Sequence, residues 1–122
     1  LKLPLKYVRR KPKEHGLGKQ IEGSYLHRQK VLVVEDLIST GKSSLQVCEV
    51  LQQAGLQVVG MVSIFNYGFS QAETAFKEAG IPFYSLSNYE VLISLARQKQ
   101  LVQQEALNPL LNWRQNPEKW CQ

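Results

Sequence analysis

The chain has 122 residues, of which 43% are hydrophobic and 20% are charged, and its formal net charge is +5. These values fit one globular domain or part of one, and the absence of any apolar run of about 20 residues excludes a membrane-spanning chain. Its two cysteines, Cys48 in an apolar helical pattern and Cys121 near the end, predict no disulfide framework, so we expect a cytoplasmic protein.

The first thirty residues predict little regular structure. Leu1–Val8 has the pattern of a strand that arrives from earlier chain, so we expect that residues 1–122 form a single but partial domain. Residues 10–24 hold three glycines, one proline and many ionisable side chains, which predicts a mobile loop. A short strand is expected over Ser24–His27.

From residue 31 the pattern alternates between strands and helices. Val31–Val34 is a continuous apolar run, typical of a strand covered on both faces, and 58–65 predicts a second buried strand. The other expected elements are a helix over 43–54 that ends at Gly55, a helix over 69–79 that ends at Gly80, a strand over 81–86, a helix from Asn88 to about 98, a helix over 101–111 and an irregular tail. This order predicts an α/β fold with a parallel sheet flanked by helices.

The basic residues are concentrated near the start of the chain. A solvated segment, a nucleic-acid patch and a clamp for a phosphorylated small molecule are the possible explanations. No aromatic residues alternate with the cations as base stacking would require, so we expect no nucleic-acid partner. The cluster consists of Arg9, Arg10, Lys11, Lys13, His15 and Lys19.

Two adjacent acids, Glu35 and Asp36, follow the apolar strand and precede a polar turn with Gly41. Ligands of parallel α/β sheets bind beyond the carboxyl ends of the strands, and a helix N-terminus favours an anion. Acids followed by an anion site suggest a ligand with a cis-diol beside a phosphate, such as a ribose 5-phosphate.

Alternative motifs can be compared at the same residues. A P-loop would need glycine at position 36, which is Asp36, and a receiver domain would need a second aspartate, which the chain does not have. An exposed strand end followed by an ordinary helix-capping turn remains an alternative for the segment taken alone.

The segment VLVVEDLISTGKSS, residues 31–44, resembles the PRPP-binding strand, loop and helix of the type I phosphoribosyltransferases. The segment YVRRKPKEHGLGKQIEG, residues 7–23, is similar to the mobile catalytic loop of the orotate phosphoribosyltransferases. MVSIFNYGF, YSLSNYEVL and WRQNPEKW also resemble the bacterial enzymes. The resemblance covers nearly the whole chain and implies the C-terminal half of such an enzyme, without its N-terminal hood.

The resemblance implies transfer of ribose 5-phosphate from PRPP to orotate, which yields orotidine 5′-monophosphate and pyrophosphate in pyrimidine synthesis. It also implies a homodimer, in which the basic loop acts in the neighbouring subunit, and Mg²⁺ that is carried mainly by PRPP with no direct protein ligand. Mobile cations over the leaving group would stabilise its charge and exclude water.

The resemblance also implies roles for individual residues. Lys13, Glu35 and Asp36 would be catalytic, with the two acids on the ribose hydroxyls, and Ser39 would also touch orotate. The residues implied to bind PRPP are Arg9, Arg10, Lys13, His15, Glu35, Asp36, Leu37, Ile38, Ser39, Thr40, Gly41, Lys42 and Ser43.

Two positions depart from the family pattern. Asn66-Tyr67 stands where some members have an Asp-Arg pair whose arginine holds orotate, and Lys42 stands where many have a small residue. The alternatives to the enzyme are a non-catalytic PRPP-sensing regulator of the same fold, an inactive fragment, and a purine-specific relative, against which the loop sequence argues.

Overall fold

The computed structural model describes residues 3–9 and 20–117, and its central sheet is parallel. The strands lie in the order β3 (Lys30–Ile38), β4 (Gln57–Asn66) and β5 (Phe83–Asn88). Helix α1 (Lys42–Gln53) connects β3 to β4, and α2 (Ser70–Glu78) connects β4 to β5. The predicted α/β class with a parallel sheet is therefore confirmed.

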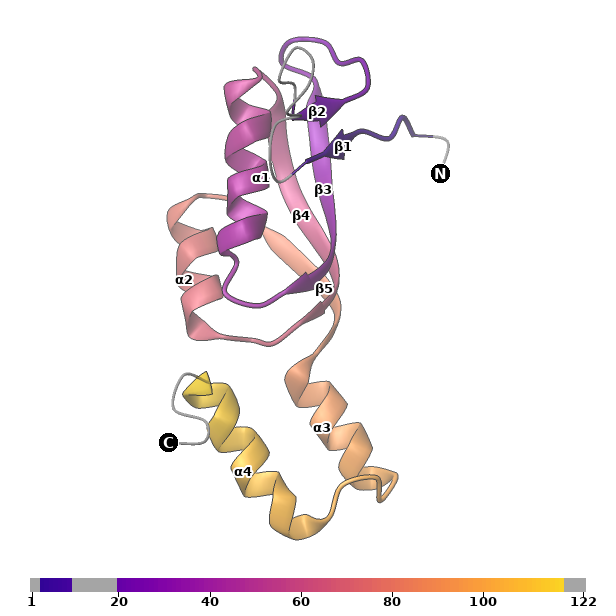
Figure 1. Ribbon diagram of the computed structural model, residues 1–122, viewed down its shortest axis with the longest axis vertical. Coiled ribbons are helices and arrows are strands. Elements are labelled where there is room, and N and C mark those ends of the chain that lie inside the picture. The colour runs from indigo at the N-terminus through magenta and orange to yellow at the C-terminus, as the bar shows by residue number, and fades with distance from the viewer. Residues whose placement is uncertain (1–2, 10–19, 118–122) are drawn as a thin grey trace.

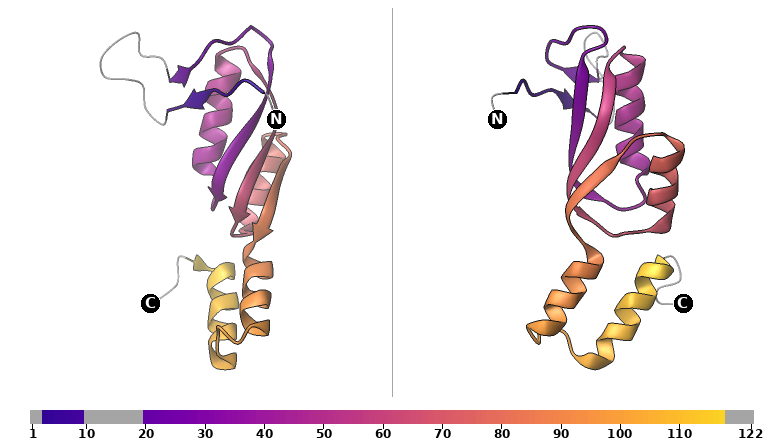
Figure 2. Two further views of the ribbon diagram at one scale, coloured as in Figure 1. Left: turned by 90° about the vertical axis from the view of Figure 1, so that its right-hand side faces the viewer. Right: turned by 180° about the vertical axis from the view of Figure 1, so that it is seen from behind.

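Helices α1 and α2 lie on the same face of the sheet (Figures 1 and 2). On that face, Val33 and Met61 are register partners and are buried in the core with Phe76 of α2. On the opposite face Leu32 is 54% and Val34 is 70% exposed. The expectation that the strand over 31–34 is covered on both faces is wrong for the described residues, because both covering helices lie on one side.

Both predicted helix stops are confirmed. Gly55 and Gly80 have φ angles of 82° and 65°, a left-handed conformation that glycine adopts without strain. Each is followed by a residue whose N–H bonds back into the last turn, from Leu56 to Leu51 at 3.0 Å and from Ile81 to Phe76 at 3.1 Å. These bonds satisfy carbonyls that would otherwise lack a partner at the helix ends.

The start of the described chain differs from the prediction. Within the described part of the strand expected over Leu1–Val8, only β1 (Tyr7–Val8) is formed, and it pairs antiparallel with β2 (Ile21–Glu22). The segment Ser24–His27 is not a strand. It leads into a turn in which Gln29 N–H donates to the carbonyl of Leu26 at 3.1 Å. The β1–β2 hairpin lies beside the amino-terminal half of β3 (Figure 1).

Two further helices, α3 (Tyr89–Gln98) and α4 (Gln104–Gln115), form a hairpin that extends from the carboxyl end of the sheet (Figure 1). Asn88 caps α3 as expected, since its side chain accepts the N–H of Val91 at 3.0 Å. Helix α4 continues beyond the predicted 101–111, so 112–115 is helical rather than irregular. No helix in residues 3–9 and 20–117 has the length and apolarity to cross a membrane.

Cys48 has no exposed surface on α1, and its thiol should be inert. Burial, with the negative charge of Glu35 adding to it, raises its pKa from 9.0 to about 11. Because the thiolate is the reactive form, we expect no labelling of folded Cys48 by a maleimide at pH 8, in a Cys121→Ser background that leaves one thiol. Rapid labelling without unfolding would contradict this burial.

The same shift predicts a pH dependence of stability. The thiol ionises more easily in the unfolded chain, so its stabilising contribution is complete below about pH 9 and is lost as the pH rises through about 11. The free energy of unfolding should therefore fall more steeply over this interval in the wild-type chain than in Cys48→Ala, which lacks the titrating group.

Candidate functional site

Glu35 and Asp36 lie within β3, which continues through Leu37 and Ile38 before the turn. Because successive strand residues point to opposite faces, the two carboxylates diverge. Glu35 is half-buried on the helix side, where its charge affects Cys48, and Asp36 is exposed. A ligand that contacts both acids therefore has to approach β3 at its free edge or beyond its carboxyl end.

Gly41 makes the turn between β3 and α1. It is buried, its φ is 78°, and a Cβ at this position would lie 2.9 Å from Cε2 of Phe76. Its carbonyl accepts the N–H of Leu45 at 2.9 Å, which begins the helix. Among the described residues no side chain caps α1, so its first N–H groups remain available at the positive end of the helix dipole. This geometry suits a phosphate.

The residues around Gly41 differ in what they can offer a ligand. Ile38 is 1% exposed, so its side chain belongs to the core, and its carbonyl already accepts the N–H of Tyr67 at 3.1 Å. The other predicted contact residues of this segment are partly or fully exposed: Leu37, Ser39, Thr40, Lys42 and Ser43.

Aromatic side chains gather at the carboxyl end of β4, next to the end of β3. The rings of Tyr67 and Phe69 are stacked at 5.4 Å with an interplanar angle of 10°. Trp113 of α4 packs against both at 5.6 and 5.8 Å, and against Tyr89 of α3 at 5.3 Å. Tyr67, which stands at the position of the family arginine, is thus part of a packed cluster that fixes α4 to the sheet.

Arg114 brings a guanidinium to the segment between β4 and α2, at Gly68. Its Nη1 lies 3.6 Å from Oε2 of Glu90 and 3.6 Å from where a Cβ on Gly68 would stand. The sequence analysis did not select Arg114, because it assigned residue 114 to an irregular tail. The available signal was that Trp113 and Arg114 lie just beyond the helix predicted over 101–111, so that a longer helix would have included Arg114.

The basic loop begins and ends at the β1–β2 pair and the adjoining residues Arg9 and Gln20, here called the neck. Arg9 N–H donates to the carbonyl of Gln20 at 2.8 Å, and the Arg9 guanidinium contacts Glu22 Oε1 through Nε at 2.7 Å and through Nη2 at 2.6 Å. In this structure the guanidinium of Arg9 is therefore directed to Glu22, which the sequence analysis had not selected. Arg10, Lys13 and His15, with the 10–19 part of the predicted loop, lie outside the described residues.

Replacing Glu22 with Gln should cost little stability. Both side chains of the Arg9–Glu22 pair are about 40% exposed, so solvent screens their attraction, and such pairs contribute about 0.2–1 kcal/mol. We expect a loss in this range by urea unfolding, and a smaller loss in high salt. A loss several times larger, or one that does not respond to salt, would show that Glu22 does more than pair with Arg9.

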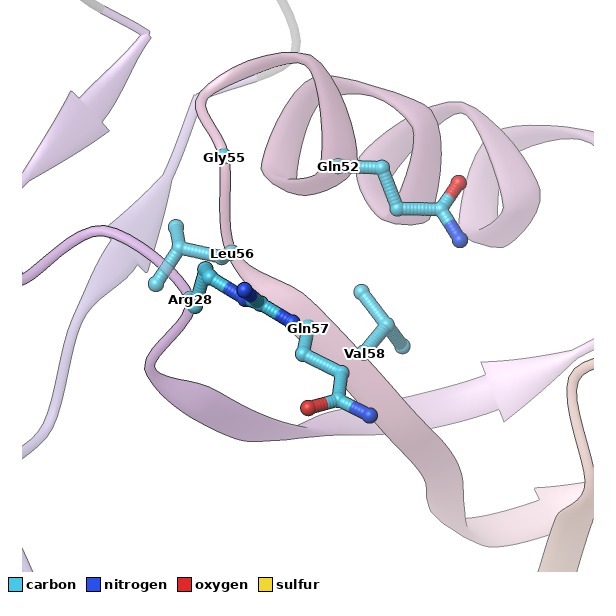
Figure 3. Close-up of a pocket in the computed structure, with 6 residues that line it drawn as sticks. All are labelled: Arg28, Gln52, Gly55, Leu56, Gln57 and Val58. Atoms are coloured by element: carbon cyan, nitrogen blue, oxygen red, sulfur yellow. The ribbon is translucent and has the colours of Figure 1, made fainter.

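A hollow of about 310 Å³ lies away from these residues, where α1 ends and β4 begins (Figure 3). Its lining comes from the end of α1, the start of β4 and the segment before β3, so it opens at the amino end of the sheet. It is thus separate from the carboxyl-end features predicted to bind ligand. The lining residues are Arg28, Gln52, Gly55, Leu56, Gln57 and Val58.

Comparison with known proteins identifies close relatives, although no family model matches the chain. The chain is 51% identical over 120 residues to the orotate phosphoribosyltransferase of Cytophaga hutchinsonii and 50% identical over 118 residues to that of Bacillus subtilis. These alignments cover 98% and 97% of this chain but 57% and 55% of the relatives. The chain therefore spans about half the length of the curated relatives it matches.

Solved structures share its fold. The UMP synthase of Leishmania donovani matches with a TM-score of 0.77 at 26% identity, over 92% of this chain and 24% of that protein. The orotate phosphoribosyltransferase of Mycobacterium tuberculosis in complex with PRPP matches with a TM-score of 0.53 at 34% identity, over 58% and 42%. By sequence and by fold, the chain is therefore similar to the orotate phosphoribosyltransferases, over a part consistent with the C-terminal half of such a protein.

Proposed function

We propose that the chain is the PRPP-binding part of an orotate phosphoribosyltransferase. The whole protein would transfer ribose 5-phosphate from PRPP to N1 of orotate, with orotidine 5′-monophosphate and pyrophosphate as products of a step in pyrimidine synthesis. The observation that carries the proposal is the unit formed by β3, Gly41 and α1, in which two acids precede a glycine turn and an uncapped helix N-terminus. A free buried thiol at Cys48 fits a cytoplasmic location.

The chemistry assigns a task to each part of this unit. The bond from C1 of the ribose to a pyrophosphate oxygen breaks and a bond from C1 to N1 of orotate forms, through a transition state with positive charge on the ribose. Glu35 and Asp36 would hold the ribose hydroxyls and stabilise that charge, while Ser39–Ser43 would bind the 5′-phosphate. Lys13, with the other loop cations, would stabilise the departing pyrophosphate.

Mg²⁺ would accompany PRPP. The residues at this edge fit a substrate-borne ion better than a resident one, because Glu35 and Asp36 point to opposite faces of β3. Within residues 3–9 and 20–117, the His, Cys, Asp and Glu side chains form no group of three or more that could hold a metal. Mg²⁺ commonly binds through one or two carboxylates together with substrate phosphates. Bound in that way, it would neutralise charge on the pyrophosphate.

We propose a homodimer in which the basic loop serves the neighbouring subunit. The neck of the loop lies beside the amino-terminal half of β3, whereas Asp36 and Gly41 lie toward and beyond its carboxyl end (Figure 1). The neck and the proposed ligand site therefore lie at different places along β3. The resemblance to the orotate phosphoribosyltransferases implies that the loop of one subunit closes over the site of the other.

The base itself would be held by Ser39 and by Arg114, since orotate carries a carboxylate and Tyr67 replaces the family arginine. The Arg114 side chain is 27% exposed, and its 3.6 Å contact with Glu90 is long enough to yield to a carboxylate ligand. We expect Arg114→Gln to raise the KM for orotate about tenfold or more, with little change in the KM for PRPP. Arg97→Gln, in the last turn of α3, is the matched control. Equal effects of both variants would exclude this role.

The test of the proposed function is an orotate assay with PRPP and Mg²⁺. It would compare this chain with an extended protein that also contains the N-terminal part present in the relatives. We expect the extended protein to consume orotate and release pyrophosphate. Use of a purine base with no use of orotate would overturn the substrate, and PRPP binding without turnover would indicate a regulator. Turnover by the extended protein alone would mean that the 122-residue chain is an inactive fragment.

A further inference from the structure

The hollow at the amino end of the sheet has the composition of a ligand site. Its volume is about 310 Å³, close to the lower limit of small-molecule sites, which is about 300 Å³. Leu56, which is 5% exposed, and Val58, which packs against the core, give it an apolar floor. Arg28 and the amides of Gln52 and Gln57 supply its polar groups. An apolar lining with a few polar groups is the usual composition of a small-molecule site.

The charge around the hollow is positive. Figure 3 shows the Arg28 side chain extended over the start of β4 toward Gln57, with Gln52 reaching out from α1. Lys30, the register partner of Gln57, is exposed beside them. Among the residues that the structure describes, no acid forms an ion pair with Arg28 or Lys30. The guanidinium of Arg28 is therefore available to an anionic ligand.

Backbone hydrogen bonds hold the walls of the hollow together. Arg28 N–H donates to the carbonyl of Gly55 at 2.6 Å, and Gln57 N–H donates to the carbonyl of Gln29 at 2.9 Å. These bonds fix the segment before β3 to the turn between α1 and β4. Arg28 itself has a φ of 62°, a left-handed conformation that is uncommon for a residue with a side chain. An unfavourable backbone that its surroundings hold in place is typical of functional positions.

We propose that the hollow is a second anion site, which binds the phosphate group of a small phosphorylated molecule through Arg28, Gln52 and Gln57. A guanidinium binds phosphate through two parallel N–H···O bonds. The two amides can donate to the remaining phosphate oxygens, and a phosphate uses more of these donors than a carboxylate because it presents more oxygens. The site lies at the opposite end of the sheet from Gly41, so it does not depend on the proposed transfer of ribose 5-phosphate.

Site-resolved NMR of the isotope-labelled 122-residue chain tests this site. Titration with inorganic phosphate at constant ionic strength should shift the side-chain amide signals of Gln52 and Gln57 along a saturable curve. We expect Arg28→Gln to raise the dissociation constant read from these signals at least about tenfold. Arg28→Lys keeps the charge but loses the paired N–H groups, so it should recover only part of the affinity. Arg97→Gln, exposed on α3, is the matched control and should leave the constant unchanged.

The backbone signals of Lys42 and Ser43 report the other anion site in the same spectra. They should respond to phosphate equally in the wild-type chain and in Arg28→Gln, so a failure of either site is seen separately. Shifts at Gln52 and Gln57 that do not saturate, or that Arg28→Gln leaves unchanged, would overturn the proposal. A stronger response to acetate than to phosphate would overturn the phosphate assignment. If Arg28→Gln unfolds, Gln57→Leu should still weaken binding at the Gln52 signal, and unchanged binding there would overturn the proposal.

Discussion

Replacing Gly41 with Ala is expected to lower the free energy of unfolding by about 2–5 kcal/mol, from two separate causes. An L-residue at the φ of 78° is strained by about 1–2 kcal/mol. The added methyl group would also lie 2.9 Å from the ring of Phe76. Phe76 is 1% exposed, so its ring has little space into which to move, and such overpacking costs about 1–3 kcal/mol. Urea unfolding followed by circular dichroism measures the sum.

Gly80 is the matched control, because it has a φ of 65° and no atom lies within 4 Å of the place that an added methyl group would take. Gly80→Ala should therefore show only the backbone cost, about 1–2 kcal/mol. Phe76→Leu alone is destabilising. In the double variant with Gly41→Ala, however, it removes the ring that the added methyl group contacts, so the loss in free energy of unfolding should be smaller than the sum of the two single losses. Equal losses in Gly41→Ala and Gly80→Ala would show that contact with Phe76 does not constrain the turn.

The same substitution should weaken anion binding. Movement of the chain at residue 41 shifts the N–H groups of the first turn of α1, on which the proposed phosphate contact depends. Isothermal titration of the 122-residue chain with PRPP should show binding that Gly80→Ala keeps and Gly41→Ala loses. Unchanged binding in Gly41→Ala would place the phosphate elsewhere.

The helix ends were predictable from sequence because their causes are local. Gly55 and Gly80 follow apolar helical patterns, and a glycine there permits the left-handed residue that ends a helix. Asn88 likewise caps α3 through a bond within its own segment. The alternation of strands and helices was equally sufficient to predict a parallel sheet.

The features that the sequence did not predict depend on contacts between distant segments. The run Val31–Val34 has the same pattern whether a sheet is covered on one face or on two, so only the positions of α1 and α2 show that its Leu32 and Val34 are exposed. The Arg9–Glu22 pair requires the register of β1 and β2, which are far apart in the sequence. The divergence of Glu35 and Asp36 requires that β3 extend beyond them, which two apolar residues alone do not establish.

In the extended protein, Lys13→Ala should lower kcat for orotate by about 10²–10³-fold. The proposed role of Lys13 is to stabilise charge on the departing pyrophosphate, and removal of one such preorganised group has an effect of this size. Lys77→Ala, which removes the same charge from the last turn of α2, is the control and should leave kcat unchanged. Unchanged turnover in Lys13→Ala would overturn the assignment of the basic loop.

Mixed dimers would show in which subunit Lys13 acts. Homodimers of Lys13→Ala and of Asp36→Asn should each be nearly inactive, since one lacks the loop cation and the other a ribose contact. If the loop serves the neighbouring subunit, a mixed dimer joins the intact loop of one chain to the intact acids of the other and restores one of its two sites. Random reassortment of equal amounts should then recover about one quarter of the wild-type activity, because half of the dimers are mixed. A loop that served its own subunit would restore no site, and the mixture would show only the residual activity of its two parents.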